Sequence, residues 1–224
     1  MKTVQPIIVG ISGASGSGKT TLASSLENTF GDRVARIVHQ DNYFKGESCP
    51  SYKERTDLET PENIRWDDFA SDLQQVAKDV ASRCNNGDEN SRKRNIIIVE
   101  GYLLLAHDEL LELFDYLIFL RSTRTICMQR RLGRRSDRTK SEKDALCEYF
   151  GKYVWPNYEE HTLKRYENLE HERHLCVDSS ASNVCSKTGE RHLPCCTICL
   201  DAETMTAAGV LNATVSWLKE EHVF

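Results

Sequence analysis

The feature that most constrains this chain is an eight-residue string, Gly13-Ala14-Ser15-Gly16-Ser17-Gly18-Lys19-Thr20, which fits the pattern G-x-x-x-x-G-K-[ST] at every fixed position. An apolar run at residues 7–12 precedes the string, and Leu22 and Leu26 follow it at helical spacing. Glycines let backbone N–H groups turn inward around phosphate oxygens, and the following helix directs its positive end toward the same point. The string therefore predicts a phosphate-binding loop between a buried strand and a helix.

Two side chains of this loop have expected roles of their own. Lys19 supplies a positive charge toward the β- and γ-phosphates, and Thr20 offers a hydroxyl to Mg²⁺. We therefore expect ATP and Mg²⁺ as cofactors, although the motif alone indicates a nucleotide phosphate and does not separate kinases from other nucleotide-binding proteins. The residues expected at the nucleotide phosphates are Gly13, Ala14, Ser15, Gly16, Ser17, Gly18, Lys19, Thr20 and Thr21.

Short apolar runs alternate with longer segments of helical periodicity, which predicts an α/β fold of the P-loop NTPase type. We expect a parallel sheet of about five strands flanked by helices, in a single domain spanning residues 1–224. The expected strands cover residues 7–12, 34–39, 96–99, 116–120 and 196–200. The expected helices cover residues 19–30, 63–82, 123–133, 206–221 and a segment from Pro156 toward Glu172, with polar loops at 84–95 and 178–194.

Composition argues against several classes of protein. The net charge of −5 opposes broad nucleic-acid binding, which needs a basic surface. The longest apolar stretch, residues 96–106, is interrupted by Glu100 and is too short for a membrane span, and the first residues do not resemble a signal peptide. We therefore expect a cytoplasmic protein, monomeric or homodimeric, whose nine cysteines are reduced.

His192, Cys195, Cys196 and Cys199 have spacings that a zinc site could use. The segment 196–200 also reads as an apolar strand, in which cysteine acts as a small hydrophobic residue. We favour the strand and leave open whether cysteines between residues 185 and 199 bind a metal.

Two acidic residues lie where predicted strands end: Asp41 just after the strand at 34–39, and Glu100 directly after the strand at 96–99. Ligands of open parallel sheets bind outside the carboxyl ends of the strands, and neighbouring strands are only about 4.8 Å apart. Both acids are therefore expected beside the γ-phosphate held by Lys19. Asp41 is the candidate acceptor for the proton of a substrate hydroxyl, and the expected metal ligands are Thr20, Asp41 and Glu100.

Five arginines cluster late in the helix at 123–133 and after it: Arg130, Arg131, Arg134, Arg135 and Arg138. Arg130, Arg134 and Arg138 are four residues apart and share a face if the helix continues. An isolated arginine run is at least as well explained by a solvated charged surface. In a P-loop protein, however, a mobile arginine-rich lid stabilises charge on the transferred phosphoryl group and excludes water. We expect such a lid at about residues 134–148.

Several strings occur in the same order as in nicotinamide riboside kinases, members of a wider uridine kinase-like group with phosphoribulokinase and pantothenate kinase. They are the phosphate loop at 13–20, Gln-Asp-Asn-Tyr-Phe-Lys at 40–45, Thr-Pro-Glu at 60–62, Glu-Gly-Tyr-Leu-Leu at 100–104 and Val-Trp-Pro-Asn-Tyr at 154–158. The chain thus resembles this family from residue 7 to about residue 158, and weakly in the final strand and helix. The string at 154–158 is the one that points to the riboside kinases.

This resemblance implies an ATP-dependent kinase that phosphorylates the 5′-hydroxyl of a riboside, with nicotinamide riboside converted to nicotinamide mononucleotide in NAD biosynthesis. It implies that Asp41, Lys19 and Arg135 are catalytic. The further nucleotide-binding residues that it implies are the lid residues Arg134 and Arg138, and Asp201, Ala202 and Glu203 near the adenine. The substrate-binding residues that it implies are Asp41, Asn42, Tyr43, Phe44, Asp57, Glu59 and Arg135.

The chain departs from the family pattern at three places. The family often has one aromatic residue just after the last lid arginine, where this chain has Thr139 and Lys140. Leu58 replaces another aromatic residue, and Glu59 replaces the usual aspartate. A nicotinamide ring is flat and cationic and favours aromatic faces, so a uridine or cytidine kinase, or a kinase of another small metabolite, stays an alternative. A regulatory NTPase is more distant, because the chain has no D-x-x-G after the third predicted strand and no N-K-x-D string.

Overall fold

A five-stranded sheet forms the centre of the computed structural model, which describes residues 5–45, 59–86, 95–178, 196–221 and 223. The strands lie in the order β2-β3-β1-β4-β5, and every neighbouring pair is parallel. Their bounds are Ile7–Gly13 (β1), Val34–His39 (β2), Ile96–Gly101 (β3), Tyr116–Arg121 (β4) and Cys196–Asp201 (β5). The predicted parallel sheet is therefore confirmed, and each strand lies where the sequence placed it.

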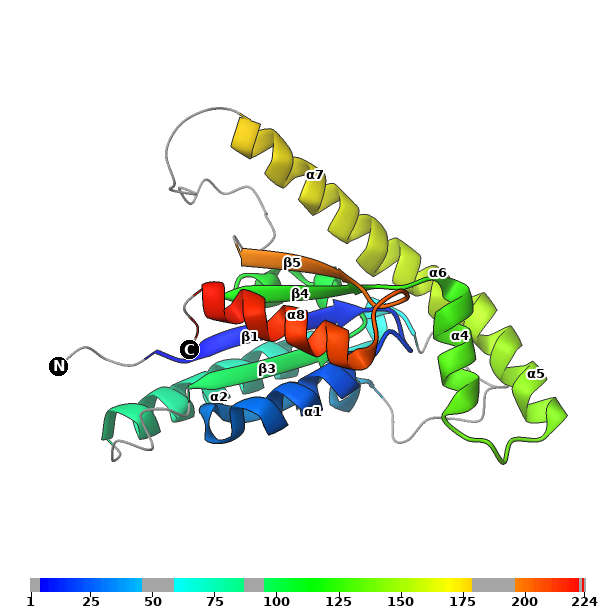
Figure 1. The fold of residues 1–224 in the computed structure, drawn as a ribbon, viewed down its shortest axis with the longest axis horizontal. Helices are drawn as coiled ribbons and strands as arrows, with labels where there is room; N and C mark the ends of the chain where they lie inside the picture. Colours follow the sequence, from blue (N-terminus) through cyan, green and yellow to red (C-terminus); the bar gives the residue numbers. More distant parts are fainter. Residues whose placement is uncertain (1–4, 46–58, 87–94, 179–195, 222, 224) are drawn as a thin grey trace.

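Helices cover both faces of this sheet, as Figure 1 shows. The helices on one face are α1 (Lys19–Phe30) and α8 (Ala207–Glu220). The main helices on the other face are α2 (Trp66–Asn86), α3 (Asp108–Leu111), α6 (Trp155–Tyr158) and α7 (Lys164–Asp178).

Strand β3 illustrates why both faces are covered. Ile96 and Ile98 pack into the core on the α1 side, whereas Ile97 and Val99 pack into the core on the α2 side. All four side chains are buried. Successive side chains of a strand point to opposite faces, so a strand apolar at every position requires a layer of helices on each side.

One long helical stretch runs without interruption from Lys140 to Asp178, through α5 (Lys140–Tyr149), α6 and α7. The prediction that a helix begins near Pro156 is therefore wrong, because the helical conformation begins earlier. Proline lacks an N–H group and its ring crowds the carbonyl four residues before it. The π-helical turn Phe150–Val154, directly before α6, is wider than an α-helical turn and accommodates this proline.

Helices α4 (Arg124–Gly133) and α5 lie beyond the carboxyl ends of the strands (Figure 1). Because α4 ends at Gly133, Arg134 and Arg138 do not continue the helical face that carries Arg130. The three arginines would have shared a face only if the helix had continued. The segment expected as a lid consists of the connection after α4 and most of α5. Helix α5 begins with a capping box in which Thr139 and Glu142 each accept a hydrogen bond from the other's backbone.

Some expectations fall outside the described residues, namely Asp57, most of the loop at 178–194, and His192 and Cys195 of the considered zinc site. Within the described part of the chain, no group of three or more His, Cys, Asp or Glu side chains could hold a metal ion. The helices described here also include none that is both long and apolar enough to cross a membrane.

Candidate active site

The loop between β1 and α1 lies tightly against its neighbours. Gly16 has a φ of 97°, and a Cβ there would lie 2.6 Å from the Cys127 carbonyl oxygen in α4. Gly13 has a φ of 146°, and a Cβ there would lie 2.5 Å from the Leu120 carbonyl oxygen in β4. Both the backbone conformation and the lack of space therefore require glycine, which is why the sequence pattern has glycines here.

The N-terminus of α1 opens onto the same loop. Its N-cap residue, Gly18, has no side chain that could cap the first N–H groups of the helix. The Ser17 hydroxyl is buried and has no hydrogen-bond partner among the residues that the structure describes. Uncapped N–H groups and an unpaired buried hydroxyl are suited to an anionic group, so these residues fit a phosphate.

Lys19 supplies the positive charge of this loop. Its side chain is buried, and Nζ donates a hydrogen bond of 2.9 Å to the Ala14 carbonyl oxygen. Burial lowers the pKa of Lys19, while the Glu100 and Asp41 carboxylates act in the opposite direction. The lysine and the two acids predicted from the strand ends therefore interact electrostatically in one site.

Glu100 is the buried acid of this site. Its Oε1 accepts a hydrogen bond of 3.0 Å from the Thr20 hydroxyl and lies 2.8 Å from Nδ1 of His39. The contact with His39 follows from the sheet, because His39 of β2 and Glu100 of β3 are paired in register. Thr20 and Glu100 thus present oxygen atoms side by side, as a magnesium site needs.

Asp41 lies in the short 3₁₀ turn Gln40–Tyr43 directly after β2, and it is exposed to solvent. Neighbouring protein nevertheless displaces water from its carboxyl and raises the pKa above the usual 3.8. Lys19 opposes this shift, whereas Glu100 and Glu59 add to it. Asp41 is thus an exposed carboxylate that interacts electrostatically with the lysine of the phosphate loop.

The other expected acceptor residues near Asp41 differ in their surroundings. Asn42 is exposed. The Tyr43 ring stacks on Phe69 of α2 at a centroid distance of 4.4 Å, and its hydroxyl donates to Asp72 at 3.1 Å. Tyr43 therefore serves the contact between the turn and α2. The half-buried Phe44 lies parallel to the Tyr102 ring at 6.3 Å, near the end of β3.

Glu59 lies at this same end of the sheet. Tyr102 donates a hydrogen bond to the Glu59 Oε2, and Tyr149 of α5 donates to Oε1 at 2.8 Å. Glu59 contributes to the raised pKa of Asp41, so the two acids expected to bind the acceptor lie near each other.

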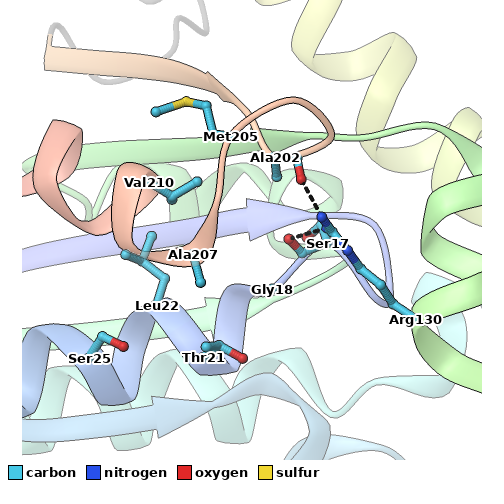
Figure 2. A pocket seen from close by; sticks show the side chains of 10 residues that line it. All are labelled: Ser17, Gly18, Thr21, Leu22, Ser25, Arg130, Ala202, Met205, Ala207 and Val210. Carbon is cyan, nitrogen blue, oxygen red and sulfur yellow. Dashed lines mark hydrogen bonds between the residues drawn. The ribbon is translucent and has the colours of Figure 1, made fainter. Parts of the chain in front are cut away.

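A cavity of about 200 Å³ opens beside the phosphate loop, between α1 and α8 (Figure 2). It is lined by Ser17, Gly18, Thr21, Leu22, Ser25, Arg130, Ala202, Met205, Ala207 and Val210. Four of the residues expected to bind the nucleotide therefore line one cavity. Its apolar side chains come from α1, from the loop after β5 and from the start of α8, and such a lining suits the flat face of a base.

Arg130 of α4 joins the two sides of this cavity. Its guanidinium donates to the Ala202 carbonyl oxygen at 2.6 Å and to the Ser17 carbonyl oxygen at 3.4 Å, as Figure 2 shows. The Asp201 carboxylate accepts hydrogen bonds from the Glu203 N–H at 2.9 Å and from the Thr204 hydroxyl at 2.8 Å. Asp201 thus shapes the loop after β5, while Ala202 lines the cavity itself.

The remaining arginines occupy distinct places. Arg131 donates to the Ser15 hydroxyl at 2.7 Å, and Arg138 donates to the Arg131 carbonyl oxygen at 3.0 Å. Arg134 is exposed, and the exposed Arg135 forms an ion pair with Asp137 at 3.2 Å. Arg130 and Arg131, rather than the expected lid arginines, are therefore the ones that contact the phosphate loop directly.

Known proteins are similar to this chain over much of its length. A family model described as "AAA domain" matches residues 9–151. The uridine kinase of Leuconostoc citreum is 31% identical over 183 residues, which covers 74% of this chain and 87% of that protein. The chain belongs to the P-loop kinase family that includes these uridine kinases. The uridine kinase of Chlamydia pneumoniae is 27% identical over 203 residues, covering 84% of this P-loop kinase and 90% of that protein.

A sugar kinase from Janibacter sp. HTCC2649 shares the fold, with a TM-score of 0.52 and 15% sequence identity, covering 96% of this chain and 95% of that chain. The uridine kinases named above, rather than this fold similarity, confirm the resemblance to the uridine kinase-like group. The narrower resemblance to nicotinamide riboside kinases stays a prediction.

Proposed function

We propose that this P-loop kinase transfers the γ-phosphoryl group of ATP to the 5′-hydroxyl of a riboside. The observation that carries the proposal is the convergence of Lys19, Glu100 and Asp41 at the carboxyl ends of adjacent strands. Asp41 is the exposed member of this group, so it is the one that an acceptor can reach. The uridine kinases among the relatives support a riboside as the acceptor.

In this reaction the acceptor oxygen forms a bond to the γ-phosphorus, the bond to the β-phosphate oxygen breaks, and ADP leaves. Asp41 orients the hydroxyl and takes its proton late, since the transition state of phosphoryl transfer is loose. Lys19 and the N–H groups of the loop bind the phosphates. Thr20, Asp41 and Glu100 would hold Mg²⁺, which when bound neutralises negative charge on the phosphates.

The lid arginines complete the proposed site. Arg134 and Arg135 are exposed at the connection between α4 and α5, from which their long side chains would reach bound ligands. Arg135 would exchange its ion pair with Asp137 for the acceptor or the transferred group at little cost, because water screens a pair this exposed. Arg138 holds the end of α4 and would keep the connection in place.

Nicotinamide riboside is the first candidate acceptor, and uridine or cytidine is the second. The Val-Trp-Pro-Asn-Tyr string that favours the first places Val154, Trp155 and Tyr158 in the buried core. These three side chains therefore serve the packing of the core, and the string gives no information about which base the protein contacts. The relatives named above favour the second candidate.

The experiment is a panel of ribosides with Mg-ATP, in which ADP and the 5′-phosphorylated product are both measured. We expect ADP formation that depends on the acceptor, with one riboside preferred. Asp41→Ala should abolish transfer while binding of a non-hydrolysable ATP analogue persists. ADP release at equal rates with and without any acceptor would instead identify an NTPase.

A further inference from the structure

Two tyrosine hydroxyls converge on Glu59 from separate elements. Tyr149 is the last residue of α5, and its hydroxyl lies 2.8 Å from Oε1. Tyr102 directly follows β3; its hydroxyl donates to Oε2 and also lies 3.0 Å from the Glu59 carbonyl oxygen. Each carboxylate oxygen thus receives one phenol donor, which leaves further lone pairs on both oxygens for a ligand.

Both phenols are buried, at 5% exposure each, whereas Glu59 is only half-buried. Burial and the nearby Glu59 carboxylate raise the pKa of Tyr102 far above its ordinary value, so this hydroxyl stays protonated and remains a donor. A buried donor that loses its partner is costly, so the two phenols hold the carboxylate in a defined orientation. A glutamate needs this more than an aspartate does, because its longer side chain has one more rotatable bond.

The contact also connects two parts of the proposed site. Tyr102, which donates to Glu59, lies parallel to the Phe44 ring at a centroid distance of 6.3 Å, and Phe44 directly follows the turn that carries Asp41. Tyr149 belongs to α5, the helix that begins directly after the lid arginines. The position of the Glu59 carboxylate therefore depends on where α5 lies relative to the end of β3.

We propose that Tyr102 and Tyr149 are positioning residues, which hold the Glu59 carboxylate toward the acceptor and tie it to the lid helix α5. The inference rests on the proposed function, since it gives Glu59 its role toward the acceptor. Neither tyrosine touches the reacting atoms. Their removal should therefore affect acceptor binding and leave the chemical step nearly intact.

The test compares Tyr102→Phe and Tyr149→Phe with the matched control Tyr116→Phe. Phenylalanine keeps each ring in place, including the contact between Tyr149 and Tyr153 at 5.6 Å, so the variants should fold. Tyr116 lies at the first position of β4, and its hydroxyl faces the Glu221 carbonyl oxygen at 3.4 Å. Removing its hydroxyl should change no kinetic constant.

We expect each of the two site variants to raise the acceptor KM about tenfold, the effect of one hydrogen bond to a charged group. The turnover number and the KM for ATP should stay within about twofold of the wild type. In a Glu59→Gln background, adding Tyr149→Phe should have no further effect on the acceptor KM, because the two changes act through one group. A full additional loss in that background, or an unchanged acceptor KM in both single variants, would overturn the proposal.

A second measurement separates this inference from the proposed function. If the wild-type protein phosphorylates no riboside, the proposed function fails, and amide hydrogen exchange then decides the structural claim. Tyr149→Phe should increase exchange in α5 and in the segment that follows Glu59, whereas Tyr116→Phe should not. Equal exchange in the wild type and in Tyr149→Phe would refute the link between Glu59 and α5.

Discussion

Gly101, at the end of β3, has almost no space for a side chain. A Cβ added there would lie 2.3 Å from Oε1 of Gln40 and 2.5 Å from its Cβ. Ordinary van der Waals contact begins at 3.4 Å, so the distance of 2.5 Å falls short by 0.9 Å. Gln40 is fully buried and directly precedes Asp41. Gly101→Ala should therefore displace the turn that carries Asp41 by about 1 Å.

This displacement should affect both stability and turnover. Oε1 of Gln40 accepts a hydrogen bond of 3.0 Å from the Leu103 N–H, and leaving that buried donor unpaired costs about 1–3 kcal/mol. Overpacking at the site costs about 1–3 kcal/mol more. We expect the free energy of unfolding to fall by about 2–6 kcal/mol. A misplacement of about 1 Å at Asp41 should lower the turnover number by about 10²-fold.

Chemical denaturation, riboside-dependent ADP formation and binding of an ATP analogue measure these effects separately. The analogue should still bind, because the three atoms nearest to a Cβ at Gly101 all belong to Gln40 and none to the phosphate loop. The matched control is Gly133→Ala, where an added Cβ meets nothing within 4 Å, and stability should change by less than about 1 kcal/mol. The reasoning is refuted if Gly101→Ala matches the wild type in both unfolding free energy and turnover.

Three further predictions concern the nucleotide, the acceptor and pH. Arg130→Ala removes both hydrogen bonds that join the phosphate loop to the loop after β5, and it should weaken binding of an ATP analogue about tenfold in calorimetry. Unchanged affinity would show that the cavity does not receive the nucleotide. Arg135→Ala should raise the acceptor KM more than the KM for ATP; because its ion pair with Asp137 is exposed, the unfolding midpoint should not move. An equal rise in both KM values would contradict the acceptor role. The raised pKa of Asp41 means that its carboxyl is protonated, and unable to accept a proton, below a midpoint higher than 3.8. The value of kcat/KM should therefore increase with pH through that midpoint, since it reports the free enzyme, and a midpoint at or below the ordinary value would count against Asp41 as the base.

The local features of this protein were accessible from its sequence. The phosphate loop, with Gly13 and Gly16 in conformations that only glycine adopts readily, follows from a string of neighbouring residues. The proximity of Asp41 and Glu100 could also be predicted, because Glu100 directly follows one predicted strand, Asp41 lies two residues beyond another, and parallel strands end at one edge. The adjacency of β2 and β3 confirms that reasoning.

Other features depend on residues that are distant in sequence, and periodicity carries no information about them. His39 contacts Glu100 because β2 and β3 are in register, and Arg130 contacts Ala202 because α4 lies over the loop after β5. The sequence placed the start of the long helical stretch too late, because a proline such as Pro156 usually marks the first turn of a helix. Here the wider π-helical turn before it accommodates the proline inside the helical stretch.

The sequence alone determined which chemical groups this protein brings to a phosphate, since the loop residues are neighbours in the chain and their backbone requirements are local. Only the tertiary structure decided how the acids are held. Glu59 is bound by Tyr102 and Tyr149, which lie 43 and 90 residues away along the chain. Such contacts form when separate elements pack together, and packing depends on the whole set of buried side chains rather than on any one segment.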